Sequence, residues 1–236
     1  MHRRTAPRLA RILACAAVPV MLVATGCSDD SGSEKETAKP TKSAAPSAAP
    51  SVKAATFAKL PEVCKTVTEK TVENLVPKAD KKEGNALRTT DTNDSASCFW
   101  SGLNTEDVKN LQYRSLTVSL KRFASDPTLG SGEKRAEVFA EQQAKKATTE
   151  DGAKNAKTEK AEGIGDSASV VSTESKKDDN DFKNQTVVTR TANVVVVVKY
   201  SGAGYEGAKS PDVDDMKKGA QEAAKEAVNA VTAANK

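Results

Sequence analysis

The chain has almost no histidine and few aromatic residues. Its single histidine is His2, and aromatic residues make up 4% of the 236 residues. His2 lies in a segment that we expect to be removed during export, which would leave the mature protein without histidine. That would exclude Ser-His-Asp and Cys-His mechanisms and any histidine metal site. The scarcity of aromatic side chains means that the core must be built mainly from valine, leucine and alanine.

Residues 1–26 have the features of a bacterial lipoprotein signal peptide. Their basic segment holds four arginines, Arg3, Arg4, Arg8 and Arg11. The apolar run that follows, 12–24, suits a cleaved signal but is shorter than the roughly 20 residues that span a bilayer. Small residues precede Cys27, so we predict lipid attachment to Cys27 and a location on the outer face of the cell membrane. Secretion with an ordinary cleavage site is the alternative, and the sequence after Arg4 favours the general secretory route over the twin-arginine route.

The signal peptide also accounts for the positive charge of the precursor. The full chain has 36 Lys+Arg and 32 Asp+Glu, and residues 1–26 contain four of the basic residues and none of the acidic ones. Export would therefore leave 32 basic residues against the same 32 acidic ones. A neutral chain gives no support to nucleic-acid binding, and we expect no nucleic-acid partner.

Residues 27–56 are expected to form a disordered tether. They are mainly Ser, Ala, Pro, Lys and Glu, with an S-A-A-P repeat between 43 and 51. A segment with almost no large apolar side chains cannot offset the entropy lost on ordering. As a flexible coil it would span about 30 Å. A glycosylated tether is the alternative to a plain spacer.

Residues 57–236 are long enough for a single domain with its own core. Apolar periodicity predicts three helices, at 61–75, 133–147 and from 212 onward. It also predicts strands at 98–100, 111–123, 167–173, 182–190 and 194–200. The Lys-rich stretch 148–163 is expected to be a mobile loop. A bulge is expected near Arg114, because the apolar residues before and after it fall in opposite phases.

The late strands and the last helix decide the predicted fold class. Short, turn-rich joints between the late strands favour an antiparallel sheet. Residues 194–198 are all valine, which indicates a strand that is covered on both faces. The last helix carries an apolar stripe of Val213, Met216, Ala220, Ala224, Ala227, Val228 and Val231. We therefore predict an α+β fold, an α/β/α sandwich whose mainly antiparallel sheet is covered by helices.

Two cysteines remain for the domain once Cys27 carries lipid. Cys64 and Cys98 would both face an oxidising compartment, so we predict a disulfide between them. Closing a loop of this length would stabilise the fold by roughly 3–4 kcal/mol. Two free thiols or a metal pair are the alternatives, and the lack of nearby histidine weakens the metal interpretation.

Several local motifs suggest chemistry but have simpler interpretations. Residues 202–207 have G-x-G-x-x-G spacing, yet no second parallel strand follows as a dinucleotide fold requires. The acidic run 178–181 lacks the spacing of a calcium loop, which favours a solvated turn. Residues 163–166 resemble a tight turn, with a catalytic role for Asp166 as the alternative. Trp100 is expected to pack against the disulfide rather than to serve as a ligand platform.

A set of these motifs resembles one known family. In chain order they are the lipid-attachment motif before Cys27, the tether, P-E-V-C ending at Cys64, C-F-W from Cys98, G-I-G-D over 163–166, and the valine strand with its Ala-rich terminal helix. Together they resemble the actinobacterial envelope lipoproteins of the domain-of-unknown-function family numbered 3558. The resemblance covers roughly 57–236 and implies a PsbP-like α/β/α sandwich. It implies no catalytic residue, because that family has no established activity.

The function expected from the sequence is non-enzymatic. We expect a membrane-anchored binding, sensor or accessory module of the cell envelope that engages an envelope protein or a small ligand. No catalytic, cofactor-binding or metal-binding residue is assigned, and no cofactor is expected. The alternative is a cell-wall hydrolase that uses a carboxylate pair or a Ser/Lys dyad. Two converging carboxylates in a pocket would favour the hydrolase.

Overall fold

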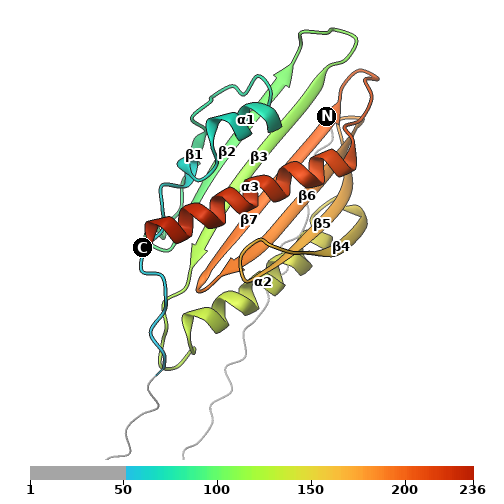
Figure 1. Ribbon diagram of the computed structural model, residues 1–236. Coiled ribbons are helices and arrows are strands. Elements are labelled where there is room, and N and C mark those ends of the chain that lie inside the picture. Colours follow the sequence, from blue (N-terminus) through green and yellow to red (C-terminus); the bar gives the residue numbers. More distant parts are fainter. Residues whose placement is uncertain (1–51) are drawn as a thin grey trace, which may run out of the picture. The chain divides into compact units, whose positions relative to one another are not determined.

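The computed structural model describes residues 52–236 (Figure 1). The predicted signal peptide at 1–26, the predicted lipid-attachment residue Cys27 and most of the predicted tether at 27–56 lie outside the described residues. Within 52–236, none of the helices combines the length and the apolarity that crossing a membrane requires.

A single sheet of seven antiparallel strands forms the centre of the domain. Its spatial order is β1-β2-β3-β7-β6-β5-β4, so the last strand in the sequence lies in the middle (Figure 1). The strands are β1 Asn85–Leu87, β2 Ser95–Asn104, β3 Gln112–Arg122, β4 Lys154–Ala161, β5 Ser167–Lys177, β6 Asn180–Thr191 and β7 Val194–Gly204.

Helices cover both faces of this sheet, which confirms the predicted α+β fold. The helical elements are η1 Val63–Lys65, α1 Glu69–Leu75, α2 Gly132–Thr148 and α3 Val213–Ala234. The main core lies between one face of the sheet and the helices η1, α1 and α3. A smaller cluster lies between the opposite face and α2.

The valine strand is buried on both faces, as its composition predicts. Val194, Val196 and Val198 of β7 belong to the main core beneath α3. Val195 and Val197 point to the opposite face, where they contact the α2 cluster. Successive side chains of a strand point to opposite faces, so a strand covered by helices on both sides has no polar phase.

The stripe of α3 is buried from Met216 to Val231, whereas Val213 at its start is 38% exposed. Asp212 caps the helix, because its carboxylate accepts hydrogen bonds from the backbone N–H groups of Asp214 and Asp215. The first turn of α3 therefore extends beyond the apolar core. This leaves Val213 beside the hollow described below.

The predicted helix over 61–75 is wrong as one element, because η1 and α1 are separate. Thr68 lies between them with an extended backbone, and its hydroxyl accepts a hydrogen bond from the backbone N–H of Thr71. The hydroxyl of Thr66 also donates a hydrogen bond to the carbonyl of Val63. Hydroxyl side chains that bond locally to the backbone compete with a continuous helix, and here they produce a turn and a new cap.

The stretch 148–163 is not a loop, because it contains strand β4. This strand pairs with β5 at the edge of the sheet, and all of its residues except Ala161 are exposed. An exposed edge strand rich in lysine lacks the apolar alternation that predicts strands.

The expected bulge near Arg114 is also wrong, since β3 pairs with both neighbours in continuous register. The irregularity lies instead in β4, between Lys154 and Lys157.

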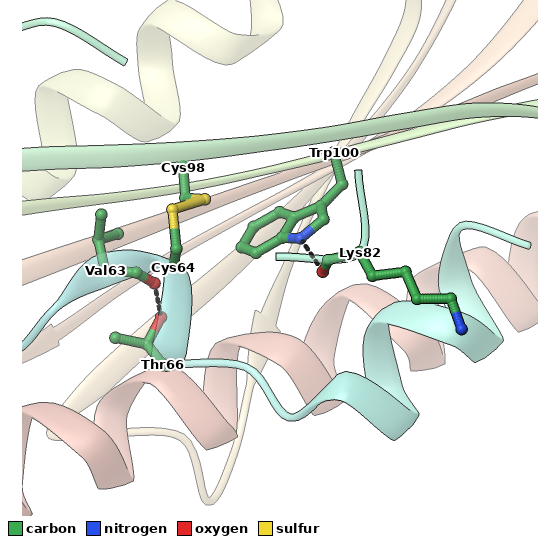
Figure 2. The surroundings of a disulfide bond; sticks show 6 residues. All are labelled: Val63, Cys64, Thr66, Lys82, Cys98 and Trp100. Atoms are coloured by element: carbon green, nitrogen blue, oxygen red, sulfur yellow. Dashed lines mark hydrogen bonds between the residues drawn. A yellow bond between two sulfur atoms is a disulfide. The ribbon is translucent and has the colours of Figure 1, made fainter. Parts of the chain in front are cut away.

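The predicted disulfide joins Cys64 of η1 to Cys98 of β2, with 5.2 Å between the Cα atoms (Figure 2). Trp100 lies two residues further along β2 in the same core, 1% exposed, and its indole nitrogen donates to the carbonyl of Lys82 at 3.1 Å. Gly84 fits against both side chains, because a Cβ atom there would lie 2.5 Å from the Cys98 sulfur and 2.6 Å from the Trp100 ring. The tryptophan is thus part of the packing around the disulfide.

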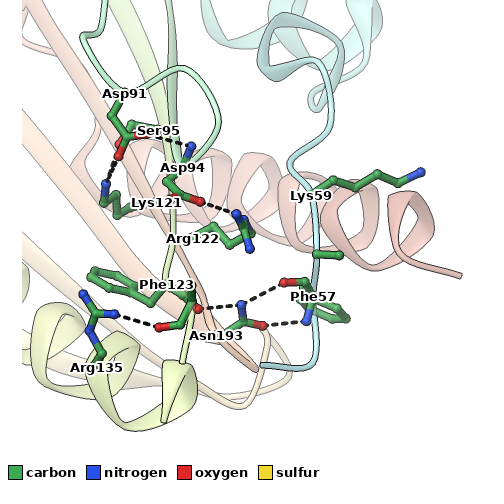
Figure 3. Close-up of polar contacts among 12 residues, drawn as sticks. Phe57, Lys59, Asp91, Asp94, Ser95, Lys121, Arg122, Phe123, Arg135 and Asn193 are labelled. Atoms are coloured by element: carbon green, nitrogen blue, oxygen red, sulfur yellow. Dashed lines mark hydrogen bonds and ion pairs between the residues drawn. The ribbon is translucent and has the colours of Figure 1, made fainter. Parts of the chain in front are cut away.

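Two asparagines fix the segment that leads into the domain. Buried Asn193, in the β6–β7 turn, accepts from the backbone N–H of Phe57 at 2.7 Å and donates to the carbonyls of Phe57 and Phe123 (Figure 3). Asn235 accepts from the N–H groups of Ala58 and Lys59 and donates to the Lys59 carbonyl. The chain therefore joins the sheet at one defined end, which we call the near end.

Candidate functional site

Two hollows on the α3 face lie toward the opposite end of the sheet, which we call the far end. On the α3 face, the buried valines of β7 are followed by Tyr200 and Gly202. The strand register places Gln185 of β6 and Ser172 of β5 in the row of Tyr200. The next row contains Lys183 and Glu174. The apolar floor of the sheet thus becomes polar where α3 begins.

A hollow of about 690 Å³ lies beside the first turn of α3, above these polar rows. Its floor comes from β5 and β6, and its walls come from the irregular part of β4 and from the start of α3. The residues that line it are Asn155, Ala156, Lys157, Ser172, Thr173, Glu174, Lys183, Gln185, Val213 and Asp214. A volume of this size accommodates a small ligand.

Gln185 is the notable polar group on the floor of this hollow. Its side chain is 1% exposed, and its amide oxygen accepts a hydrogen bond from the Ser172 hydroxyl at 2.7 Å. Its amide nitrogen has no hydrogen-bond partner among residues 52–236. The surrounding protein does not seal this nitrogen from solvent. It can therefore donate into the hollow, and buried polar groups are nearly always hydrogen-bonded.

The charged groups around the hollow are balanced. Lys183 pairs with Glu174, and Asn155 donates to the same carboxylate at 2.6 Å. The hydrogen bonds from Lys183 and Asn155 hold the pKa of Glu174 below its ordinary value, so this carboxylate is ionised at neutral pH. Lys157 forms no ion pair with the carboxylates of the described chain, and Asp214 lies 3.5 Å from Lys217. A polar ligand without large net charge suits this environment.

A second, smaller hollow of about 340 Å³ lies on the other side of the α3 start, where α1 ends. Arg114 lines it and donates to the side chain of Gln112 at 3.0 Å. Tyr200 also lines it, and its hydroxyl donates to the Leu75 carbonyl at 2.6 Å. Burial raises the pKa of Tyr200, so it remains a neutral donor. The two aspartates that line this second hollow, Asp212 and Asp215, belong to the capped first turn of α3.

A serine and a lysine meet near the other end of the sheet. The Lys121 amine donates to the Ser95 hydroxyl at 2.9 Å and to Asp91 at 2.8 Å (Figure 3). The hydrogen bond from Lys121 holds the pKa of Asp91 below its ordinary value, so this carboxylate is ionised at neutral pH. A lysine that acts as a general base must be neutral, and a carboxylate partner favours the charged form.

The other motifs have structural roles. Gly163 and Gly165 have φ values of 72° and 62° and form the tight turn, and a Cβ atom on Gly165 would lie 2.4 Å from the Arg190 carbonyl. Asp166 pairs with Arg190 at 2.8 Å, which is a structural contact. Of the acidic run 178–181, Asp178 and Asp179 form the β5–β6 hairpin turn, and Asn180 and Asp181 begin β6. No group of three or more possible metal ligands occurs among residues 52–236.

The motif at 202–207 does not form a nucleotide site. Gly202 and Gly204 lie inside β7, and the chain continues into α3 without a further strand in its described part. A Cβ atom on Gly202 would lie 2.9 Å from the side chain of Arg114. The glycine thus makes room for that arginine. A dinucleotide fold instead needs the glycine turn to open a helix between parallel strands.

Comparisons with known proteins give one weak likeness. No protein-family model and no curated protein matches this chain. A similar solved structure is that of LpqN, involved in cell envelope biogenesis of Mycobacterium tuberculosis, with 13% identity and a TM-score of 0.33 over 60% of this chain and 82% of that chain. A likeness of this degree carries no argument about function. The resemblance to the family numbered 3558 is not confirmed.

Gln185 was not among the residues predicted from the sequence. The signal that identifies it is its phase, because Gln185 alternates with Val187 and therefore shares the face that α3 covers. A long polar side chain in the buried phase of a strand is unusual, and it needs a partner in the protein or in a ligand.

Proposed function

We propose that this chain is a non-enzymatic binding module of the bacterial cell envelope, anchored to the outer face of the membrane by lipid on Cys27. Its ligand is a small polar molecule that carries a hydrogen-bond acceptor and occupies the hollow beside α3. The observation that carries this proposal is that Gln185 is nearly buried and lines that hollow, while its amide nitrogen has no hydrogen-bond partner among residues 52–236.

The architecture supports this proposal. Residues 57–59 join the sheet at the near end, whereas the hollow lies toward the far end. Along β7 the two ends are separated by about 30 Å, given a rise of roughly 3.3 Å per residue. An anchor that is attached through the near end does not occupy the surface around the hollow. The neutral mature chain and the balanced charges of the hollow favour an uncharged polar ligand over a polyanion.

Replacing Gln185 by leucine is expected to weaken ligand binding about tenfold, because one hydrogen bond to the ligand is lost. The measurement is the rise in melting temperature of the purified protein with a panel of small polar envelope components, such as amino sugars and short peptides. Leucine has a similar volume, so the free protein should remain folded.

The matched control is Gln142→Leu, which changes an exposed glutamine on α2. This variant should respond to the panel as the unchanged protein does. Equal responses of the unchanged protein and Gln185→Leu would contradict a role for Gln185. If no compound of the panel raised the melting temperature of the unchanged protein, the proposal of a small-ligand site would lose its support.

The contact between Ser95 and Lys121 favours a hydrolase as the second candidate function. That function would require Lys121 to lose its proton although Asp91 lies 2.8 Å away. The test is hydrolysis of a nitrophenyl ester by the unchanged protein and by Ser95→Ala. A rate that depends on Ser95 would establish the hydrolase, and equal background rates would reject this dyad.

A further inference from the structure

The opposite face of the sheet carries a broad surface that no helix of the described chain covers. Helix α2 packs on β4 to β7 and on the end of β3, and it leaves β2 and most of β3 open. The side chains that point outward there are mainly hydroxyl groups. We call this surface the hydroxyl face, and it consists of Ser97, Phe99, Ser101, Tyr113, Ser115, Thr117, Ser119 and Ser201.

The hydroxyl face is continuous across three strands. Ser115 of β3 lies directly between Ser101 of β2 and Ser201 of β7. From Tyr113 to Ser119 the face extends about 20 Å along β3, at roughly 3.3 Å per residue. Its width over three strands is about 10 Å, at roughly 4.8 Å between neighbours. This is a flat surface that is long in one direction, unlike the hollow beside α3.

Two charged side chains share this side of the sheet, because Lys199 lies directly beside Thr117 in the paired strands and Lys121 follows Ser119 in the outward phase of β3. Both are engaged by carboxylates, since Lys121 pairs with Asp91 and Lys199 pairs with Glu150. Asp80 accepts a hydrogen bond from Ser101. Solvation alone does not require this pattern, because lysine and glutamate serve equally well on a face that only meets water. Since both lysines are paired with carboxylates, this side of the sheet offers no unpaired lysine to an anion, which favours an uncharged partner.

Three aromatic rings border the hydroxyl face at the far end. Tyr113 and Tyr205 are nearly parallel, with ring centroids 5.8 Å apart, and Phe182 meets both edge-on at 5.9 and 6.3 Å. The rings are partly exposed. One third of the nine aromatic residues of the chain thus gathers beside an open polar surface. A ring presents a rigid apolar face, and Tyr adds a polar tip.

Free hydroxyl groups lie between these rings and the near end. Ser97 and Ser119 bond to each other at 2.8 Å. In contrast, the hydroxyls of Ser115, Thr117 and Ser201 have no side-chain partner among the residues that the structure describes. A hydroxyl donates one hydrogen bond and accepts two, so this row matches a partner whose own groups are hydroxyls.

We propose that the hydroxyl face binds a neutral polysaccharide strand of the cell envelope. Sugar hydroxyls would exchange hydrogen bonds with Ser115, Thr117 and Ser201, and the apolar face of a sugar ring would pack on the aromatic border. A polyanion would need excess positive charge, and a protein partner would need an apolar centre. This proposal rests on the proposed function in one respect only, which is that the chain is exported.

The test is electrophoresis of the protein, released from membranes in detergent, through gels that contain an α-glucan, a mannan, a galactan or an arabinan. We expect at least one of these neutral polysaccharides to retard the unchanged protein. Thr117→Glu places a charge at the centre of the hydroxyl face and should weaken the retardation at least tenfold. The double variant Tyr113→Ala with Tyr205→Ala should do the same.

The control is Thr158→Glu, the same substitution on the exposed edge strand β4, away from the hydroxyl face. It should be retarded like the unchanged protein, and so should Gln185→Leu, which separates this site from the hollow beside α3. The proposal is overturned if no polysaccharide retards the unchanged protein, if Thr117→Glu binds normally, or if Thr158→Glu loses binding equally. Equal melting temperatures of the two glutamate variants show that both are folded.

Discussion

Replacing Cys64 and Cys98 together by alanine is expected to lower the free energy of unfolding by about 3–4 kcal/mol. The bridge closes a loop of 34 residues, so its loss returns conformational freedom to the unfolded chain. Cys98 is fully buried beside Trp100, whereas η1 is a single short turn. Apart from the bridge, η1 contributes only Val63 to the buried core. For a domain of this size the melting temperature should fall by about 10 °C.

Thermal unfolding monitored by circular dichroism checks this expectation. A reducing agent should lower the melting temperature of the unchanged protein by a similar amount and should not change that of the double alanine variant. This second comparison separates the bridge from the side-chain volume that the substitutions remove. A melting temperature that is insensitive to both treatments would contradict a stabilising role for the disulfide.

Replacing Cys27 by alanine is expected to move the protein from the membrane fraction to the soluble exported fraction. Lipid attachment needs the thiol of that residue, and the described domain contains no helix that could hold it in a membrane. The expected change is nearly complete rather than graded, because two acyl chains provide stable anchoring whereas none provides no apolar anchor. Fractionation of cells followed by detection of the chain measures it.

Cys15 offers a matched control, because it lies within the predicted signal peptide and is also a cysteine after a small residue. Cys15→Ala should remain with the membrane. If Cys27→Ala stayed with the membrane, or if Cys15→Ala was the variant released, the predicted anchor would be wrong.

The sequence predicted those parts of the fold in which apolar periodicity decides the structure. The run Val194 to Val198 can only be a strand covered on both faces, and the structure places it at the centre of the sheet. The stripe of α3 was equally clear from Met216 to Val231, because burial repeats at helical spacing. The cysteine pair followed from counting thiols in an oxidising compartment.

Other elements gave no such signal. Strand β4 is exposed on nearly every residue, so its pairing with β5 rather than its composition determines it. The break between η1 and α1 depends on hydroxyl bonds of Thr66 and Thr68, which compete locally with a helix. In β3, the opposite phase of Tyr113 reflects packing against Phe182 and not a bulge.

The candidate site was the least predictable part. Gln185 becomes notable only when α3 lies above β6, and the sequence does not show which residues form the hollow. The hydroxyl face likewise needs the strand order, because β3 pairs with β7, which lies about 80 residues further along the chain. Serine and threonine carry little signal in the sequence, but across paired strands they form one surface.

Native mass spectrometry of the protein purified from the envelope of producing cells shows whether the hollow beside α3 holds a ligand. We expect the unchanged protein to retain a small polar molecule that Gln185→Leu lacks, while both carry the same lipid on Cys27. Identical spectra for the two proteins, without a bound molecule in either, would contradict a ligand site beside α3.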